Sequence, residues 1–349
     1  MSKRKTLSAI IMTLFLIIGC NNGGGEDPQK VFLTSIANLG KGFLDVFVTF
    51  GDMVTGAFGI KAETKKSDIG QYFIDIEKTM LSVKEKLQAE VVKNGNYEKV
   101  KTVVDQFITG TLDKIAAGAK EAAKGATGED KIGGAPTTGQ DPAPADATSV
   151  NSLVKGIKTI VGVVLKDNEG NATATKTAED DKKDIGKLFE KKDSGTEAEA
   201  AKANASIGAV TGADILKAIS KSGETADNSK NIEEAKDAAS IASAKKEDNK
   251  KEIKDEAKKD AVIAAGIALR AMAKDGKFAA KSNEEKSAHA VNGVAASAVG
   301  KTLSTLIIAI RNTVDSGLRT INAALATVKQ EDKSSEVTKT EEVRTNVKS

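Results

Sequence analysis

The chain has 349 residues, in which 52 lysines and arginines are set against 49 aspartates and glutamates. This near balance gives no general attraction to the phosphates of nucleic acids, and no patch is rich in both basic and aromatic residues. One histidine and one cysteine exclude a Cys/His metal site and a disulfide bond within the chain.

The N-terminus has the pattern of a bacterial lipoprotein signal. Basic residues at positions 3–5 precede an almost wholly apolar run at 7–18, which is shorter than the ~20 residues of a membrane-spanning helix. Small Gly19 lets a peptidase approach, and the thiol of Cys20 can accept a diacylglyceryl group. We therefore expect residues 1–19 to be removed and Cys20 to carry lipid. A plain secretion signal with an incidental cysteine is the alternative.

A flexible tether and then a folded body are expected after the signal. Residues 20–29 hold the lipidated cysteine and NNGGGEDPQ, which spans roughly 15–18 Å on average. Removal of the three basic residues of the signal leaves 49 basic and 49 acidic residues, so the mature chain is formally neutral. The body is expected over 30–330, with Pro28 in a first helical turn.

Three amphipathic helices are predicted at the start of the body. Apolar residues recur every three or four positions over 32–58, over 69–91 and over 97–115, where they run into an alanine-rich stretch. Asp68 can cap the second of these helices. Consecutive amphipathic helices of this length indicate a helical bundle.

The middle of the chain is more polar. Residues 125–149 are rich in glycine, proline, threonine and aspartate and predict a loop or linker, and a further helix follows over 150–164. Residues 167–257 are rich in alanine, lysine, aspartate and glutamate, with Phe189 as their one aromatic residue. Spaced isoleucines favour short, thinly packed helices there, and partial disorder is the alternative.

The apolar pattern returns near the C-terminus. Residues 258–281 predict a largely buried helix despite their charged ends, and a long helix is expected over 291–328, with a possible break near Gly317. The tail at 331–349 is polar. No stretch alternates as a β-strand does.

Residues suited to catalysis are few. His289 could act as a base or ligand, but an exposed bystander role is favoured. The stretch 295–302, AASAVGKT, imitates a phosphate-binding loop, yet a helical pattern runs through it without a break. A nucleotide-dependent enzyme built on Gly300, Lys301 and Thr302 is therefore a minor alternative, and we expect no enzyme activity, cofactor or metal.

Several segments together resemble the variable large proteins of relapsing-fever Borrelia and, more distantly, the VlsE-type variable surface lipoproteins. The residues that carry this resemblance are the leader ending LIIGC and four blocks: VFLTSIANLGKGFLDVFVTFGDMVTGAFGI, VNSLVKGIKTIVGVVL, KKDAVIAAGIALRAMAKDGKFAAK and LSTLIIAIRNTVDSGLRTINAALATV. They lie at both ends and along most of the frame, and the likeness is weakest over 167–257.

The resemblance implies an outer-surface lipoprotein of all-α fold, an elongated helical bundle anchored in outer-membrane lipid. Both termini would lie near the membrane, and a variable, membrane-distal cap would hold residues 167–257. In that family one version is expressed at a time, and switching evades host antibodies.

We therefore expect a variable major surface antigen whose partners are membrane lipid and host antibodies, with self-association left open. The alternative is an adhesin that holds host glycosaminoglycans through lysine-rich helix faces. Because these lysines alternate with acidic residues, a solvated helix face is favoured over a glycan site. The lysines concerned are Lys245, Lys246, Lys250, Lys251, Lys258 and Lys259.

Overall fold

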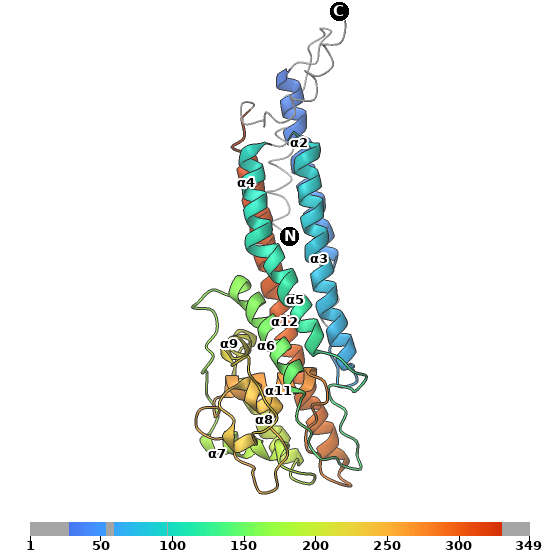
Figure 1. The fold of residues 1–349 in the computed structure, drawn as a ribbon, viewed down its shortest axis with the longest axis vertical. Coiled ribbons are helices and arrows are strands. Elements are labelled where there is room, and N and C mark those ends of the chain that lie inside the picture. Colours follow the sequence, from blue (N-terminus) through green and yellow to red (C-terminus); the bar gives the residue numbers. More distant parts are fainter. Residues whose placement is uncertain (1–27, 54–58, 96, 330–349) are drawn as a thin grey trace, which may run out of the picture. The chain divides into compact units, whose positions relative to one another are not determined.

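The computed structural model describes residues 28–53, 59–95 and 97–329. The chain forms two compact units, each described here by itself. Of the described residues, the first unit contains 28–53, 81–95, 97–112 and 314–329, and the second contains 59–80 and 113–313. Within the described ranges the regular structure is helical, and extended pairing is limited to isolated bridges. The predicted all-α class is confirmed (Figure 1).

The first unit contains helices whose apolar faces follow the predicted periodicity. Leu39, Phe43 and Leu87 are almost completely buried in it, and the rings of Phe32 and Tyr97 meet edge to face with centroids 5.7 Å apart. The elements that supply this unit, in whole or in part, are α2 (Pro28–Met53), α3 (Lys66–Lys93), α4 (Glu98–Phe107), the π-helix η2 (Ile108–Leu112) and α12 (Glu285–Leu325).

One sequence prediction about a helix end needs correction, and another lies partly outside the described residues. Helix α3 begins at Lys66, so Asp68 lies inside its first turn rather than before it, and its carboxylate accepts the backbone N–H of Lys65 at 2.9 Å. The first predicted stripe extends past α2, which ends at Met53. Positions 54–58 of that stripe lie outside the described residues.

Helix α12 is not broken at Gly317, contrary to the prediction. A Cβ atom at this position would collide with the ring of Phe107 in the first unit. Glycine is therefore present because the ring packs against the helix backbone there. By length and composition α12 could cross a membrane, but 56% of its most apolar window is buried within the protein, as in the core helix of a soluble body.

In the second unit, α5 (Asp113–Gly125) and α6 (Ala147–Val164) pack closely through glycines. A Cβ at Gly118 would meet the carbonyl of Gly156, and a Cβ at Gly156 would meet the backbone of Ala122. The helix backbones can approach because neither glycine has a side chain. This contact buries Leu153, Ile157 and the other apolar residues of α6.

The connection between α5 and α6 contains no α-helix and packs against extended chain. Gln140 pairs with Ala280, and Ala143 pairs with Lys277, in isolated antiparallel bridges. Both bridges involve the residues that follow α11 (Asp260–Met272), so this loop covers the C-terminal side of the 258–281 block.

Residues 167–257 form short helices, as predicted, and several begin with a capping box. In α8, for example, Thr196 and Glu199 satisfy each other's backbone N–H groups. Small side chains nevertheless pack closely here, so this segment has its own dense core: Ile207, Ile215 and Ile241 are at most 1% exposed. The elements are α7 (Glu179–Asp184), η3 (Ile185–Phe189), α8 (Glu197–Ala209), α9 (Gly212–Lys221), η4 (Ile232–Glu234) and α10 (Ala238–Ser243).

Candidate functional site

Helix α11 forms a completely buried floor beneath the 167–257 segment. Each residue from Asp260 to Met272 is buried, which matches the burial predicted for this block, although the helix ends at Met272 rather than at Lys281. Gly266 lets α10 approach, because a Cβ there would meet the side chain of Ile241. A helix buried on all faces needs partners for every polar group that it carries.

Asp260, the first residue of α11, connects the floor to two parts of the segment. It is 0% exposed, and its carboxylate accepts the N–H groups of Lys176 at 2.5 Å and Thr177 at 2.9 Å. The hydroxyls of Thr177 and Ser206 also donate to it. Burial by itself raises the pKa of Asp260, but these hydrogen bonds outweigh burial and lower the pKa below its ordinary value.

Lys182 holds the same turn from the other side. Its ammonium is buried and donates to the hydroxyl of Thr175 and the carbonyl of Thr177, both at 2.8 Å. It also pairs with Glu179 at 2.9 Å. The turn over 175–179 is therefore fixed between Asp260 and Lys182, one anionic and one cationic buried group.

Arg270 anchors the opposite end of α11. Its guanidinium is 0% exposed and donates to the carbonyls of Ala242 at 3.0 Å and Ala244 at 2.9 Å. It also lies 4.9 Å from the ring centroid of Phe189 and 5.9 Å from that of Phe278. Burial lowers the pKa of Arg270 to about 9. Its contacts join α10, η3 and the extended chain after α11.

Lys66, at the start of α3, caps the C-terminal end of α11. Its Nζ donates to the carbonyls of Arg270 at 3.3 Å, Ala273 at 2.5 Å and Gly276 at 2.9 Å. These carbonyls lie at and just beyond a helix C-terminus, where a cation is favourable. Burial is the main cause that lowers the pKa of Lys66 to about 7, and the charge of Asp130 opposes this effect.

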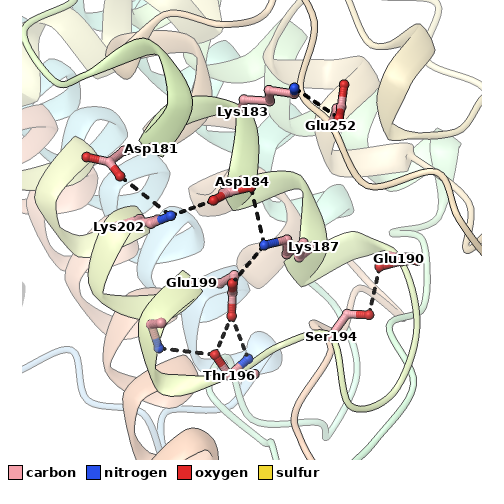
Figure 2. Close-up of polar contacts among 11 residues, drawn as sticks. Asp181, Lys183, Asp184, Lys187, Glu190, Ser194, Thr196, Glu199, Lys202 and Glu252 are labelled. Atoms are coloured by element: carbon pink, nitrogen blue, oxygen red, sulfur yellow. Dashed lines mark hydrogen bonds and ion pairs between the residues drawn. The ribbon is translucent and has the colours of Figure 1, made fainter.

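Above this floor, ion pairs connect the exposed faces of η3, α7 and α8. Lys202 pairs with Asp184 at 2.5 Å and with Asp181 at 3.5 Å. The ammonium of Lys187 lies 3.2 Å from the carboxylates of both Asp184 and Glu199, and Figure 2 shows it between them. Glu199 in turn accepts the backbone N–H of Thr196.

A second set of pairs brings in the chain before α11. Lys183 pairs with Glu252 at 3.1 Å, and Lys258 pairs with Glu179 at 3.1 Å (Lys183 and Glu252 in Figure 2). Residues from three separate parts of the segment therefore lie on one charged surface.

The lysine clusters of the adhesin alternative do not lie on helix faces, contrary to the prediction. Residues 244–259 contain no helix, because the chain turns at Asn249, where φ is 67°, and α11 begins only at Asp260. Most of the clusters also have carboxylate partners. The pairs are Lys245 with Glu247 at 3.4 Å, Lys246 with Asp141 at 2.9 Å, Lys250 with Glu233 at 3.7 Å and Lys258 with Glu179 and Asp255.

The phosphate-loop imitation lies wholly inside α12. The side chain of Lys301 donates to the carbonyl of Ile207 at 2.8 Å, and the hydroxyl of Thr302 donates to the carbonyl of Ala298 at 2.7 Å. Inside a continuous helix the backbone N–H groups are bonded within the helix and cannot turn toward a phosphate. Residues 295–302 therefore do not form the loop that the nucleotide alternative requires. Gly300 lies in the same helix.

The other sequence predictions concern the single histidine, metal binding and lipid attachment. His289 is exposed on α12 and lies 3.2 Å from Glu285, one helical turn away. Among the described residues no group of three or more His, Cys, Asp or Glu side chains could hold a metal ion. Gly19 and Cys20 lie outside the described residues, so lipid attachment and cleavage stay predictions.

One groove of about 380 Å³ lies in the second unit, between the 129–135 loop and the start of α12. Its walls are fixed by Asn292, whose amide bonds both backbone groups of Ala135 at 2.8 and 3.0 Å. Two of its charged lining residues, Asp130 and Lys277, pair with each other at 3.5 Å.

Sequence reasoning missed the buried charges, since lysine, arginine and aspartate are usually exposed. A signal was present for two of them: Asp260 and Arg270 bracket or interrupt a run of apolar residues that predicts burial. Lys66 and Lys182 have no such signal, because both stand among other polar residues.

These features define a helical protein in which a fully buried helix carries a polar, ion-paired outer segment. A family model described as Borrelia lipoprotein matches residues 43–325, so the chain belongs to the Borrelia lipoprotein family. Variable large protein 4 of Borrelia hermsii is 70% identical to it, covering 98% of this chain and 99% of that relative. Variable large protein 17 of the same species is 67% identical, over 98% of each chain.

A solved structure agrees with this placement. The crystal structure of the Lyme disease variable surface antigen VlsE of Borrelia burgdorferi is similar with a TM-score of 0.73 and 36% sequence identity. The match covers 84% of this chain and 98% of the VlsE chain. The suspected resemblance to variable large proteins and VlsE is therefore confirmed, and this chain is a member of a family of variable surface antigens.

Proposed function

We propose that this chain is an outer-surface lipoprotein that serves as a variable major surface antigen. The observation that carries the proposal is the similarity to the VlsE variable surface antigen over 84% of the chain, together with 70% identity to a variable large protein. Switching among family members would replace one antigen by another, so that antibodies against the first no longer bind the cell.

The division of the fold supports this role. Each residue of helix α11 is buried, whereas the 167–257 segment that packs on it exposes many polar side chains. Surface substitutions usually change stability by no more than ~0.5 kcal/mol. The outer side chains could therefore change without loss of the frame.

Membrane attachment is assigned to Cys20 after removal of residues 1–19. Each buried CH₂ contributes about 0.8 kcal/mol, so two or three acyl chains make a lasting anchor where one is marginal. The proposed partners are outer-membrane lipid and host antibodies, and no catalytic activity or cofactor is assigned, in keeping with relatives that are surface antigens.

The adhesin alternative has less support. A sulfated glycan would have to displace the carboxylates that already pair with most of the lysines concerned. Heparin binding that weakens steeply with salt would favour it.

Attachment and display can be tested on intact cells that produce the full chain. We expect wild-type protein to take up labelled palmitate and partition into detergent, and a Cys20→Ala variant to do neither. Antibodies specific for this chain over Variable large protein 4 should label intact cells and map mainly to residues 167–257 and 125–149. Palmitate on the Cys20→Ala variant would refute the anchor, and principal variant-specific epitopes at residues 31–58 would refute the proposed display.

A further inference from the structure

Three stretches that are far apart in sequence form one continuous surface on the second unit. They are residues 179–187, 196–202 and 252–258, called here the three-segment surface. Lys202 joins the second stretch to the first through Asp184, and Lys183 joins the first stretch to the third through Glu252 at 3.1 Å. Lys258 adds a second link to the first stretch through Glu179.

Buried contacts beneath this surface, rather than its exposed side chains, hold its shape. Lys182 in the first stretch is buried and holds the 175–179 turn, and Asp260, two residues after the third stretch, binds the same turn. Ile253 and Ala257 of the third stretch are at most 1% exposed and face the interior. A peptide cut from any one stretch would lack these contacts and would not keep the geometry.

The upper side is accessible and mixed in charge. The side chains of Glu179, Lys183 and Glu252 are 63%, 42% and 36% exposed, and Asp255 is 97% exposed. Carboxylates outnumber lysines on it: the three stretches hold nine acidic residues and six lysines, and several of the two kinds pair with each other (Figure 2). A polyanion would meet more repulsion than attraction here, whereas a polar protein partner could pair with both signs.

We propose that the three-segment surface is a single discontinuous epitope, bound by antibodies only when the chain is folded. The inference rests on the proposed antigen function and adds to it where one epitope lies and what holds it together. Antibody sites are polar and rich in tyrosine and serine, which suits a mixed surface, and about 20–30 residues a side make an interface of ordinary size. Of the 23 residues in the three stretches, 16 are not buried, so this surface supplies the greater part of such an interface.

The test uses monoclonal antibodies raised against the purified, folded full chain, so that it proceeds whether or not the chain is displayed on cells. The key variant exchanges the charges of one pair, Lys183→Glu with Glu252→Lys. This exchange keeps an ion pair between two stretches but inverts both exposed charges. We expect a group of antibodies to lose about tenfold or more in affinity for it.

The control exchanges a pair within α4 of the first unit, Lys101→Asp with Asp105→Lys, whose partners lie 2.9 Å apart. The same antibodies should bind this control within about twofold of wild type, and circular dichroism should show that both variants are folded. Synthetic peptides covering 175–205 and 248–262 should bind about a hundredfold more weakly than the full chain.

Three results would overturn the inference: peptides that bind as tightly as the chain, a charge exchange that leaves all antibodies unaffected, or salt-sensitive heparin binding that the charge exchange abolishes. Failure of the proposed function looks different, because cells would then display no epitope while the purified chain still gave this pattern.

Discussion

The hydroxyl of Thr177 donates to the carboxylate of Asp260, with Oγ1 and Oδ1 2.6 Å apart. This bond joins the beginning of the outer segment to the first residue of the buried helix α11. The carboxylate is buried and accepts hydrogen bonds from several donors at once. We therefore expect its negative charge to hold the outer segment against α11.

Replacement of Asp260 by asparagine should lower the free energy of unfolding by about 2–4 kcal/mol, since hydrogen bonds to charged groups are lost and donors are left facing an amide. Urea unfolding at pH 7 measures this loss. The control Asp255→Asn removes a carboxylate that is 97% exposed and should change stability by no more than ~0.5 kcal/mol. Equal losses in the two variants would contradict the role of Asp260.

The low pKa of Asp260 gives this effect a defined pH dependence. Just below the ordinary aspartate pKa of about 4 the unfolded chain binds the proton and the folded chain does not, so stability there rises with pH. The contribution of Asp260 is therefore complete above about pH 4 and is lost as the pH falls through its folded value. Wild type should accordingly lose more stability between pH 5 and 3 than Asp260→Asn, by at most about 1.3 kcal/mol, because one group contributes no more than about 1.4 kcal/mol per pH unit below its unfolded pKa.

Lys66 should make stability depend on pH in the alkaline range. Its pKa is about 7 in the folded chain and about 10.5 when unfolded, so the unfolded state binds more protons between these values and stability rises with pH. The slope approaches about 1.4 kcal/mol per pH unit. Between pH 7.5 and 9.5 wild type should gain stability more steeply than Lys66→Met, whereas Lys65→Met, at the exposed neighbouring position, should keep the wild-type slope. Parallel curves for all three proteins would show that Lys66 stays charged.

The contact between α5 and α6 is tested by glycine replacements within one helix. Gly156→Ala places a methyl group against the backbone of α5 and should cost about 1–3 kcal/mol. Gly162→Ala, six residues later in α6, meets nothing within 4 Å and should stabilise by up to about 1 kcal/mol through helix propensity. Thermal unfolding followed by circular dichroism separates the two, and stabilisation by both would mean that the helices are not in close contact.

Limited trypsin digestion of the folded chain should distinguish the buried helix α11 from the exposed parts of the 167–257 segment. We expect early cleavage after Lys221, Lys230 or Lys250, which are exposed and lie at the end of a helix or outside helices, and no early cleavage after the fully buried Arg270. Mass spectrometry of the first fragments identifies the sites. A first fragment that begins at Ala271 would contradict the burial of α11.

The helices with one buried face could be predicted from the sequence. In α2 and α3 the interior meets one side only, so the apolar residues recur with the period of the helix. For α11 the run of apolar residues predicted burial, but its end at Met272 was missed. The residues beyond it pair with Gln140 and Ala143, and such distant pairing leaves no local pattern.

The buried charges and Gly317 could not be placed from the sequence for a related reason. Arg270 is buried because carbonyls from α10 converge on it, and Gly317 is inside a helix because Phe107 packs on it. Both facts depend on residues more than 25 positions away along the chain. Local propensity reads arginine as exposed and glycine as a break, and tertiary contacts reverse both readings.

The groups that Asp260 and Arg270 bind have one further property in common. Two of the donors to Asp260 are main-chain N–H groups, and the acceptors of Arg270 in and after α10 are main-chain carbonyls. Every residue has the carbonyl, and every residue except proline has the N–H. The buried side chains of α11 therefore recognise the main-chain path of the outer segment more than its amino-acid sequence. A segment of different sequence that follows the same path could replace this one and keep the same hydrogen bonds.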